Sequence, residues 1–492
     1  MTTQRIDAAT QKGRIGIVHL GLGAFHRAHQ AVYLERYRGR TGDGQWGVSS
    51  ANLRRGASLV DSLAEAGFRY HVAEYRDSDN VTVREVGAIE ETLFTGQSPD
   101  GQWGRDLEAL LARLSDVKTR IVTLTVTEKG YFLNPASGEL LRDDPMIQAD
   151  IAAPQAPRTA PGILVEALKR RRNAGQAPFT VLCCDNMPDN GERTRQAVAQ
   201  FARVHDAALA DWILERVAFP CSMVDRIVPA MTEQDFAALQ TLGVDDANAV
   251  VCEAFSQWVV EDHFPEGRPA WEEEGVTMVA DVAPFETMKL RMLNGSHSLL
   301  AYLGSLADID TVFDAVSNPV YKALLSAYMR QEAAPTLDMP KEIDLDAYAD
   351  SLLARFANDS LRHKLQQIAM DGSQKLPQRW LQVAEANLAC GRDTACVALG
   401  LAGWIRYTEG STLAGRAFRV DDPMAEQLEA LHQRHGGDPR ALVDAFFGFE
   451  AVMSQALARS ERFKQQVLDA YLTLTERGVE PAIAELAAQG VC

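Results

Sequence analysis

Short apolar runs alternate with longer helical patterns through the first half of the chain, and this alternation constrains the fold more than any other feature. The run RIGIVHL at 14–20 leads through Gly21-Leu22-Gly23 into a helical pattern over 24–38. Further strand-like runs occupy 46–52, 70–75, 81–89, 120–127 and 178–186, and helical patterns separate most of them. Strands that alternate with helices pair in parallel and are covered on both faces. We therefore expect an α/β N-terminal domain with a parallel-sheet core.

The pattern changes near residue 283, where strand-like runs nearly vanish and helical periodicity takes over. The first of these helical segments covers 285–304 and the last covers 463–478. A boundary at Ala283–Pro284 predicts one domain over 1–283 and a mostly α-helical domain over 284–492. Because no long polar linker separates the two, we expect them to pack tightly, with a ligand in the cleft between them.

The charge balance limits the class of partner. Lys and Arg number 49 against 67 Asp and Glu, a net charge of −18, and the pI is near 5.1. Such a surface repels phosphate backbones, so no nucleic-acid partner is expected. Seven scattered cysteines are typical of reduced thiols. With no apolar leader and no long unbroken apolar run, the sequence predicts a cytoplasmic protein with no membrane partner.

The Gly21-Leu-Gly23 turn is the first motif with a chemical meaning. A strand that ends in G-x-G and leads into a helix presents backbone N–H groups to a pyrophosphate. The third glycine of the usual G-x-G-x-x-G is His26 here. His26, Arg27 and His29 either add donors and positive charge near the phosphates or form only an exposed polar helix face. The expected dinucleotide contacts in this motif are Gly21, Gly23, Ala24, Phe25, His26 and Arg27.

The second strand ends without the acidic residue that binds the ribose 2′-hydroxyl in an NAD site. Asn52 stands there instead, followed by Arg54 and Arg55. These two arginines are either acceptors of a 2′-phosphate or solvated loop charges. The predicted cofactor is therefore NAD, with NADP possible. Thr127 and Glu128, which follow the central strand, complete the expected cofactor residues.

Polar residues also gather on the apolar helical segment that opens the second domain. With Lys289 at 0° and about 100° per residue, Glu286 falls roughly at 60°, His297 at 80° and Asn294 at 140°. Burying such a polar face costs desolvation free energy unless its groups take part in binding or catalysis. The alternative is a solvent-exposed helix face on which the histidine has no function. A desolvated lysine can take the proton of an alcohol while amides hold the alkoxide.

Two strand ends add further candidates. Asn186 follows the buried run at 178–186 and offers a second amide donor, although an Asx-turn is the simpler role. Asp225 interrupts the apolar run at 219–229. No Cys/His cluster has the spacing of a metal site, so no metal is expected.

These motifs resemble the polyol-specific long-chain dehydrogenases/reductases. The Lys-x4-Asn-x2-His spacing is that family's signature, and similar segments extend over nearly the whole chain, at 21–30, 125–131, 184–191, 219–229, 257–264 and 289–298. The resemblance implies a Rossmann-type N-terminal domain, a mostly helical C-terminal domain, and metal-independent catalysis with NAD. It implies Lys289 as general base and Asn186 and Asn294 as the oxyanion pair. It also implies roles in substrate positioning or proton relay for His297, Asp225 and Glu286.

Within that family, segments 334–340 and 360–379 are most similar to members that act on hexuronates. This implies interconversion of D-mannonate and D-fructuronate, with mannitol/fructose or another polyol/ketose pair as the alternative. A uronate carries a carboxylate, and Arg362 and Lys375 are the favoured cations for it, ahead of Arg291, with Arg379 also available. A dinucleotide sensor without chemistry is a further alternative, but it leaves the Lys289 face unexplained.

Overall fold

The computed structural model describes residues 2–9, 12–98, 101–134, 137–360 and 362–488. The chain divides into two units, residues 1–283 and 284–492. Across the described ranges, no helix combines the length and apolar character needed to cross a membrane.

A five-stranded sheet in the order β6-β3-β2-β7-β8 forms the centre of the first unit. Its strands are β2 (Ile15–Leu20), β3 (Gly47–Asn52), β6 (Ile89–Phe94), β7 (Ile121–Leu124) and β8 (Thr180–Cys183). All four neighbouring pairs are parallel. This confirms the predicted parallel-sheet core of Rossmann type.

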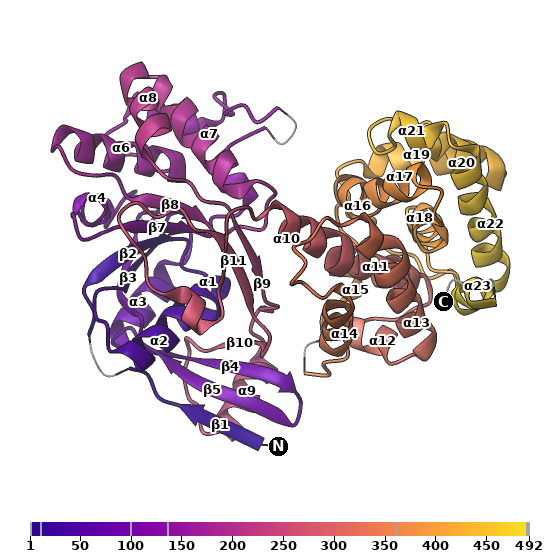
Figure 1. Ribbon diagram of the computed structural model, residues 1–492, viewed down its shortest axis with the longest axis horizontal. Coiled ribbons are helices and arrows are strands. Elements are labelled where there is room, and N and C mark those ends of the chain that lie inside the picture. The colour runs from indigo at the N-terminus through magenta and orange to yellow at the C-terminus, as the bar shows by residue number, and fades with distance from the viewer. Residues whose placement is uncertain (1, 10–11, 99–100, 135–136, 361, 489–492) are drawn as a thin grey trace. The chain divides into compact units, whose positions relative to one another are not determined.

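Successive side chains of these strands enter two separate apolar cores, which is why the runs are apolar throughout. Val18, Val122 and Val181 face one core, and their neighbours Ile17 and Ile121 face the other. Helices cover both faces (Figure 1): α4 (Leu107–Ser115), α6 (Ala160–Asn173), α7 (Asn190–Arg203) and α8 (Ala207–Arg216) on the first, and α1 (Ala24–Ala28), α2 (Gln30–Thr41) and α3 (Ala57–Glu65) on the second.

The remaining strands form two smaller sheets outside the parallel core. β4 (Tyr70–Asp77) and β5 (Asn80–Val86) are an antiparallel hairpin, flanked by β1 (Thr2–Ile6) and β10 (Val250–Glu253). Strands were predicted at 70–75 and 81–89, but they do not join the parallel sheet. Only two residues separate β4 from β5, which is enough for a hairpin and too few for a parallel crossover. The third sheet comprises β9 (Ser222–Asp225), β11 (Gln257–Glu261) and β12 (Thr277–Val279).

The second unit is helical, as predicted, and is built around two buried helices, α11 (Gly295–Leu306) and α18 (Ala395–Tyr407). Glycines let the two approach closely: a Cβ on Gly400 would lie 2.6 Å from Leu299, and one on Gly403 would lie 2.8 Å from Leu303. The surrounding helices are α10 (Ala283–Met288), α12 (Val312–Val316), α13 (Pro319–Ala327), α14 (Leu345–Phe356), α15 (Leu365–Ile368), α16 (Gly372–Leu376), α17 (Gln382–Ala389), α19 (Ala425–His435), α20 (Pro439–Phe447), α21 (Gln455–Ala458), α22 (Glu461–Arg477) and α23 (Val479–Ala488).

The single helix predicted over 285–304 is interrupted in its middle. Between α10 and α11 the chain forms a π-helical turn, η3 (Lys289–Asn294), in which the Gly295 amide donates to the Leu290 carbonyl five residues back. Two more π-helical turns, η4 (Tyr328–Ala333) and η6 (Pro377–Leu381), pack against it. Such turns are often found at functional sites, and this one contains two of the predicted catalytic residues.

Candidate functional site

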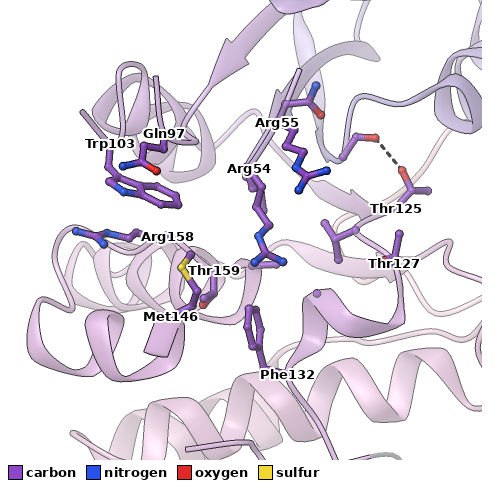
Figure 2. Close-up of a pocket in the computed structure, with 16 residues that line it drawn as sticks. Arg54, Arg55, Gln97, Trp103, Thr125, Thr127, Phe132, Met146, Arg158 and Thr159 are labelled. Carbon is purple, nitrogen blue, oxygen red and sulfur yellow. Dashed lines mark hydrogen bonds between the residues drawn. The ribbon is translucent and has the colours of Figure 1, made fainter. Parts of the chain in front are cut away.

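A cavity of about 610 Å³ opens in the first unit at the carboxyl ends of β2, β3 and β7. Gly21, Asn52 and Thr127, which the sequence assigned to the cofactor, all line it, so the fold brings these three together (Figure 2). In open α/β sheets this edge is where ligands bind. The cavity therefore lies where a dinucleotide is expected.

The turn after β2 requires its first glycine. Gly21 has a φ of +111°, and a Cβ there would lie 2.0 Å from the Thr125 carbonyl oxygen. The Thr125 hydroxyl donates to the Gly21 carbonyl at 2.8 Å, as Figure 2 shows, and His19 Nε2 lies 3.0 Å from the same oxygen. The turn is thus held against β7. Gly23, Ala24 and Phe25 follow it at the start of α1 and are half-buried, with surface left for a ligand.

The side chains of His26 and Arg27 point into the protein, which corrects the expectation that they place charge near the phosphates. His26 stacks on His19 with ring centroids 3.4 Å apart, and its Nε2 lies 3.1 Å from the Ser50 hydroxyl. Burial and the adjacent His19 hold the pKa of His26 well below its ordinary value, so the ring is neutral. The Arg27 guanidinium donates to the Asn248 carbonyl. Neither side chain therefore faces a dinucleotide.

His29 is also buried, with Nε2 3.0 Å from the Gln257 carbonyl oxygen, so an exposed polar helix face is wrong as well. The helix predicted over 24–38 is broken at this residue into α1 and α2.

Asp185 positions the loop that carries Thr127 and Glu128. Its buried carboxylate accepts from the Val126 and Thr127 amides, each at 2.9 Å, and from the Tyr131 hydroxyl at 2.7 Å. Burial raises the pKa of the Asp185 carboxyl above its ordinary value. Glu128 is exposed at the start of η1 (Glu128–Tyr131). The sequence showed Asp185 only as one polar residue after a strand, and its three donors come from a loop distant in sequence.

Asn186 and Asp225 lie at the ends of neighbouring segments of the same unit. Asn186 follows β8 and is exposed, whereas Asp225, the last residue of β9, is buried. Asn190 joins the two segments, because its side chain donates to the Ser222 carbonyl at 2.7 Å and accepts from the Ser222 amide. Arg226, next to Asp225, is a structural residue that pairs with the buried Glu74 at 2.7 Å.

Three predicted catalytic residues lie within nine positions of the second unit. Lys289, Asn294 and His297 are each 8% exposed. In a π-helical turn the backbone hydrogen bonds join residues five apart, so Lys289 and Asn294 lie closer to one face than the roughly 140° that separates them on a regular α-helix. Glu286 is half-buried one turn before Lys289, on the same face.

His297 is a neutral, buried imidazole. Desolvation, followed by the influence of His363, Arg379, Arg355 and Lys289, holds its pKa well below the ordinary value. Within the described part of the chain its Nε2 has no hydrogen-bond partner. A buried nitrogen without a partner is unfavourable in a finished core, so this atom fits a site that a polar ligand completes.

Side chains from η4 and η6 stabilise the π-helical turn at its carbonyl groups. The Tyr328 hydroxyl donates to the Arg291 carbonyl at 2.7 Å and lies 3.1 Å from that of Arg379. Trp380 Nε1 donates to the Gly295 carbonyl at 3.0 Å. Gly295 permits this packing, because a Cβ there would lie 2.1 Å from the Tyr328 hydroxyl. Tyr328 and Trp380 are positioning residues that the sequence did not reveal.

Tyr328→Phe is expected to lower the free energy of unfolding by about 1–3 kcal/mol, because the Arg291 carbonyl loses a buried donor. Turnover is expected to fall severalfold while cofactor affinity is retained, since the change loosens the turn that holds Lys289. Tyr321→Phe is the matched control, because the buried Tyr321 hydroxyl has no partner among the described residues. Equal losses of stability and turnover in both variants would contradict the positioning role.

The cations proposed for a substrate carboxylate differ in what their side chains contact. Arg379 contacts the catalytic segment, donating to the Asn294 carbonyl at 3.3 Å and to the Ser298 hydroxyl at 2.9 Å. Lys375 instead donates to the Met370 carbonyl at 2.7 Å and lies 3.7 Å from Asp371, and Arg362 is exposed. Of these three cations, Arg379 is the one whose contacts lie on the segment with Asn294.

The described ranges contain no group of three or more His, Cys, Asp or Glu side chains arranged to hold a metal ion. One buried segment of the second unit carries an amine (Lys289), an amide (Asn294) and a neutral imidazole (His297). That set can accept a proton and donate hydrogen bonds to a developing alkoxide.

Comparison with known proteins matches both units to domains of mannitol dehydrogenases. The mannitol dehydrogenase Rossmann domain matches residues 15–273, and the mannitol dehydrogenase C-terminal domain matches residues 281–475. D-Mannonate oxidoreductase of Escherichia coli (strain K12) is 46% identical over 473 residues, which cover 96% of this chain and 95% of the relative. Mannitol 2-dehydrogenase of Pyrenophora tritici-repentis is 38% identical, covering 96% of this chain and 82% of the relative.

Solved structures agree with the sequence comparisons. The ternary complex of Pseudomonas fluorescens mannitol 2-dehydrogenase with NAD and D-mannitol has a TM-score of 0.83 at 36% identity, covering 99% of this chain and 97% of that one. A substrate-free D-sorbitol dehydrogenase has a TM-score of 0.87 at 32% identity, with 98% and 97% covered. The resemblance seen in the sequence motifs is thus confirmed, and the chain belongs to the mannitol dehydrogenase family of oxidoreductases.

Proposed function

We propose that this protein is an NAD(P)-dependent dehydrogenase that interconverts D-mannonate and D-fructuronate. The observation that carries the proposal is the buried π-helical turn that contains Lys289 and Asn294 and is followed by His297, whose Nε2 has no hydrogen-bond partner among the described residues. The 46% identity to E. coli D-mannonate oxidoreductase supports the substrate, and the complex of the Pseudomonas enzyme with NAD supports the cofactor.

The first unit has the features that a dinucleotide requires. The Gly21 turn brings the backbone of β2 close to β7, and the cavity beside it is lined by Asn52 and Thr127. The backbone of the half-buried Gly23, Ala24 and Phe25 would face the pyrophosphate. When bound, the nicotinamide ring supplies the acceptor or donor of the hydride.

Lys289 is the proposed base. Lys289 is buried, and its amine takes the proton of the substrate hydroxyl during oxidation. The amides of Asn294 and Asn186 donate to the oxygen as its charge develops. The neutral His297 and the carboxylate of Asp225 orient the remaining hydroxyls, with Glu286 relaying protons from Lys289. In the reverse direction, protonated Lys289 returns the proton to the alkoxide.

Arg379 favours a uronate over an uncharged polyol. Its guanidinium reaches the segment that carries Asn294, and arginine binds carboxylates through paired charge-assisted hydrogen bonds. A polyol/ketose pair such as mannitol and fructose is the second candidate, supported by the 38% identity to a mannitol 2-dehydrogenase.

The substrate is tested by following oxidation of NADH with fructuronate, tagaturonate and fructose in parallel. We expect kcat/KM for fructuronate to exceed that for fructose by about tenfold or more, because the sugar acid gains a charge-assisted contact. Equal or faster reduction of fructose would exclude the uronate and favour the polyol. Cofactor binding without turnover of any of the three would instead identify a nucleotide sensor.

A further inference from the structure

We propose that the cavity at the end of β3 binds a 2′-phosphorylated adenosine ribose, so that NADP(H) is bound at least as tightly as NAD(H). This inference rests on the proposed function of the cavity as the dinucleotide site. Arg54 and Arg55, which follow the last residues of β3, both line the cavity.

The position of Arg54 and Arg55 after β3 is the one that selects between NAD and NADP in sheets of this type. β3 is the parallel neighbour of β2, the strand that leads into the Gly21 turn. In such sheets the residue at the end of this second strand selects the cofactor: an acidic side chain binds the ribose 2′-hydroxyl of NAD, whereas a nearby arginine accommodates the 2′-phosphate of NADP. β3 ends at Asn52, and none of the described residues lining the cavity is acidic.

Both arginine side chains are exposed. Within the described ranges neither Arg54 nor Arg55 has a side-chain hydrogen bond or ion pair, although the protein carries an excess of acidic residues. Several other arginines of this unit are paired, for example Arg38, which lies 2.7 Å from Glu90, and Arg113, which lies 2.9 Å from Glu91. Two adjacent unpaired cations repel each other, so a dianionic phosphate between them relieves an unfavourable arrangement.

Figure 2 shows both side chains projecting from the end of β3 into the open space, with the Arg54 guanidinium toward Phe132 and Thr159. Arg158 lines the same cavity and stacks over the Trp103 ring at 4.9 Å, which provides an aromatic and cationic wall suited to an adenine ring or a phosphate. The ligand class that matches three arginines and an aromatic ring is a phosphorylated adenosine.

The backbone that presents Arg54 and Arg55 is held in place. The Thr95 amide donates to the Asn52 carbonyl at 2.9 Å, and Gly96 lies so close that a Cβ there would be 2.6 Å from the Arg54 carbonyl oxygen. A fixed backbone reduces the ordering that binding requires, so the two guanidinium groups are partly preorganised for a phosphate.

Binding of 2′,5′-ADP and of 5′-AMP, measured by calorimetry on the full-length protein, tests the inference without turnover. The two ligands differ by the 2′-phosphate alone. We expect 2′,5′-ADP to bind at least about tenfold more tightly, because each guanidinium adds charge-assisted hydrogen bonds. In the Arg54→Ala, Arg55→Ala double variant the ratio of the two affinities is expected to fall by about tenfold to a hundredfold. The kcat/KM ratio of NADPH to NADH should fall in parallel.

Arg105→Ala is the matched control, because it also removes one positive charge near β3 but from a side chain that pairs with Asp61 at 2.9 Å and does not line the cavity. It should leave the affinity ratio unchanged. Equal binding of 2′,5′-ADP and 5′-AMP would overturn the inference, and so would an equal change of the ratio in the control. If NADH still supports turnover in that case, the proposed function stands. If neither NADH nor NADPH binds, both proposals fail.

Discussion

Lys289→Ala is expected to lower kcat by about 10²–10⁴-fold, the usual contribution of a general base, while the dissociation constant for NADH stays nearly the same. The separation arises because Lys289 belongs to the second unit, whereas the proposed cofactor residues belong to the first. Steady-state kinetics with fructuronate gives the first quantity, and quenching of protein fluorescence by NADH gives the second.

Lys322→Ala is the control for Lys289→Ala, since Lys322 is an exposed lysine of the same unit. It should retain normal kinetics. The pH profile provides a further check, because the limb assigned to the base should disappear from kcat/KM in the Lys289 variant. Near-normal turnover of Lys289→Ala would show that another group takes the proton, and the assignment would be wrong.

Gly21→Ala is expected to reduce the free energy of unfolding by about 2–5 kcal/mol and to abolish measurable NADH binding. Two effects add up: the φ of +111° is unfavourable for alanine, and the new Cβ would overlap the Thr125 carbonyl oxygen at 2.0 Å. The chain must therefore separate β2 from β7 where the cofactor is expected. Thermal unfolding and NADH titration measure the two consequences.

Gly23→Ala separates backbone strain from a general intolerance of the motif. Gly23 has a φ of −113°, and the nearest atom to its Cβ would be 3.8 Å away. The free energy of unfolding of the Gly23→Ala variant should match that of the wild type. Any loss of affinity should be confined to cofactor binding. A Gly21→Ala protein as stable as Gly23→Ala would show that the turn is not held against β7.

The parts of the fold that the sequence predicts are those encoded by local patterns. The strands at 15–20 and 121–124 are buried on both faces, so their apolar runs identify them directly. The Lys289, Asn294 and His297 spacing identified the family because it is local too. Arg158 and Trp103 were missed, since loops far apart in sequence bring them to one cavity.

His26 shows why a polar residue near a motif can mislead. Its place after the glycines suggested an exposed donor, yet His19 stacks on it and Ser50 bonds to it from two neighbouring strands. The π-helical turn was unpredictable for the same reason. Its carbonyl groups are satisfied by Tyr328 and Trp380, which lie 37 and 85 positions away from the residues they contact.

The π-helical turn also determines which kinds of mutation this segment can accept. A π-turn contains one more residue than the α-turn it replaces, so deleting a single residue from 289–294 would let α10 and α11 merge into one regular helix. The hydrogen bond from the Gly295 amide to the Leu290 carbonyl would then be lost, and the five-residue spacing of Lys289 and Asn294 with it. Conservative replacements of Leu290 or Met292 leave that spacing intact, whereas a change in length does not. The spacing of this stretch is therefore under stricter constraint than the identity of its apolar side chains.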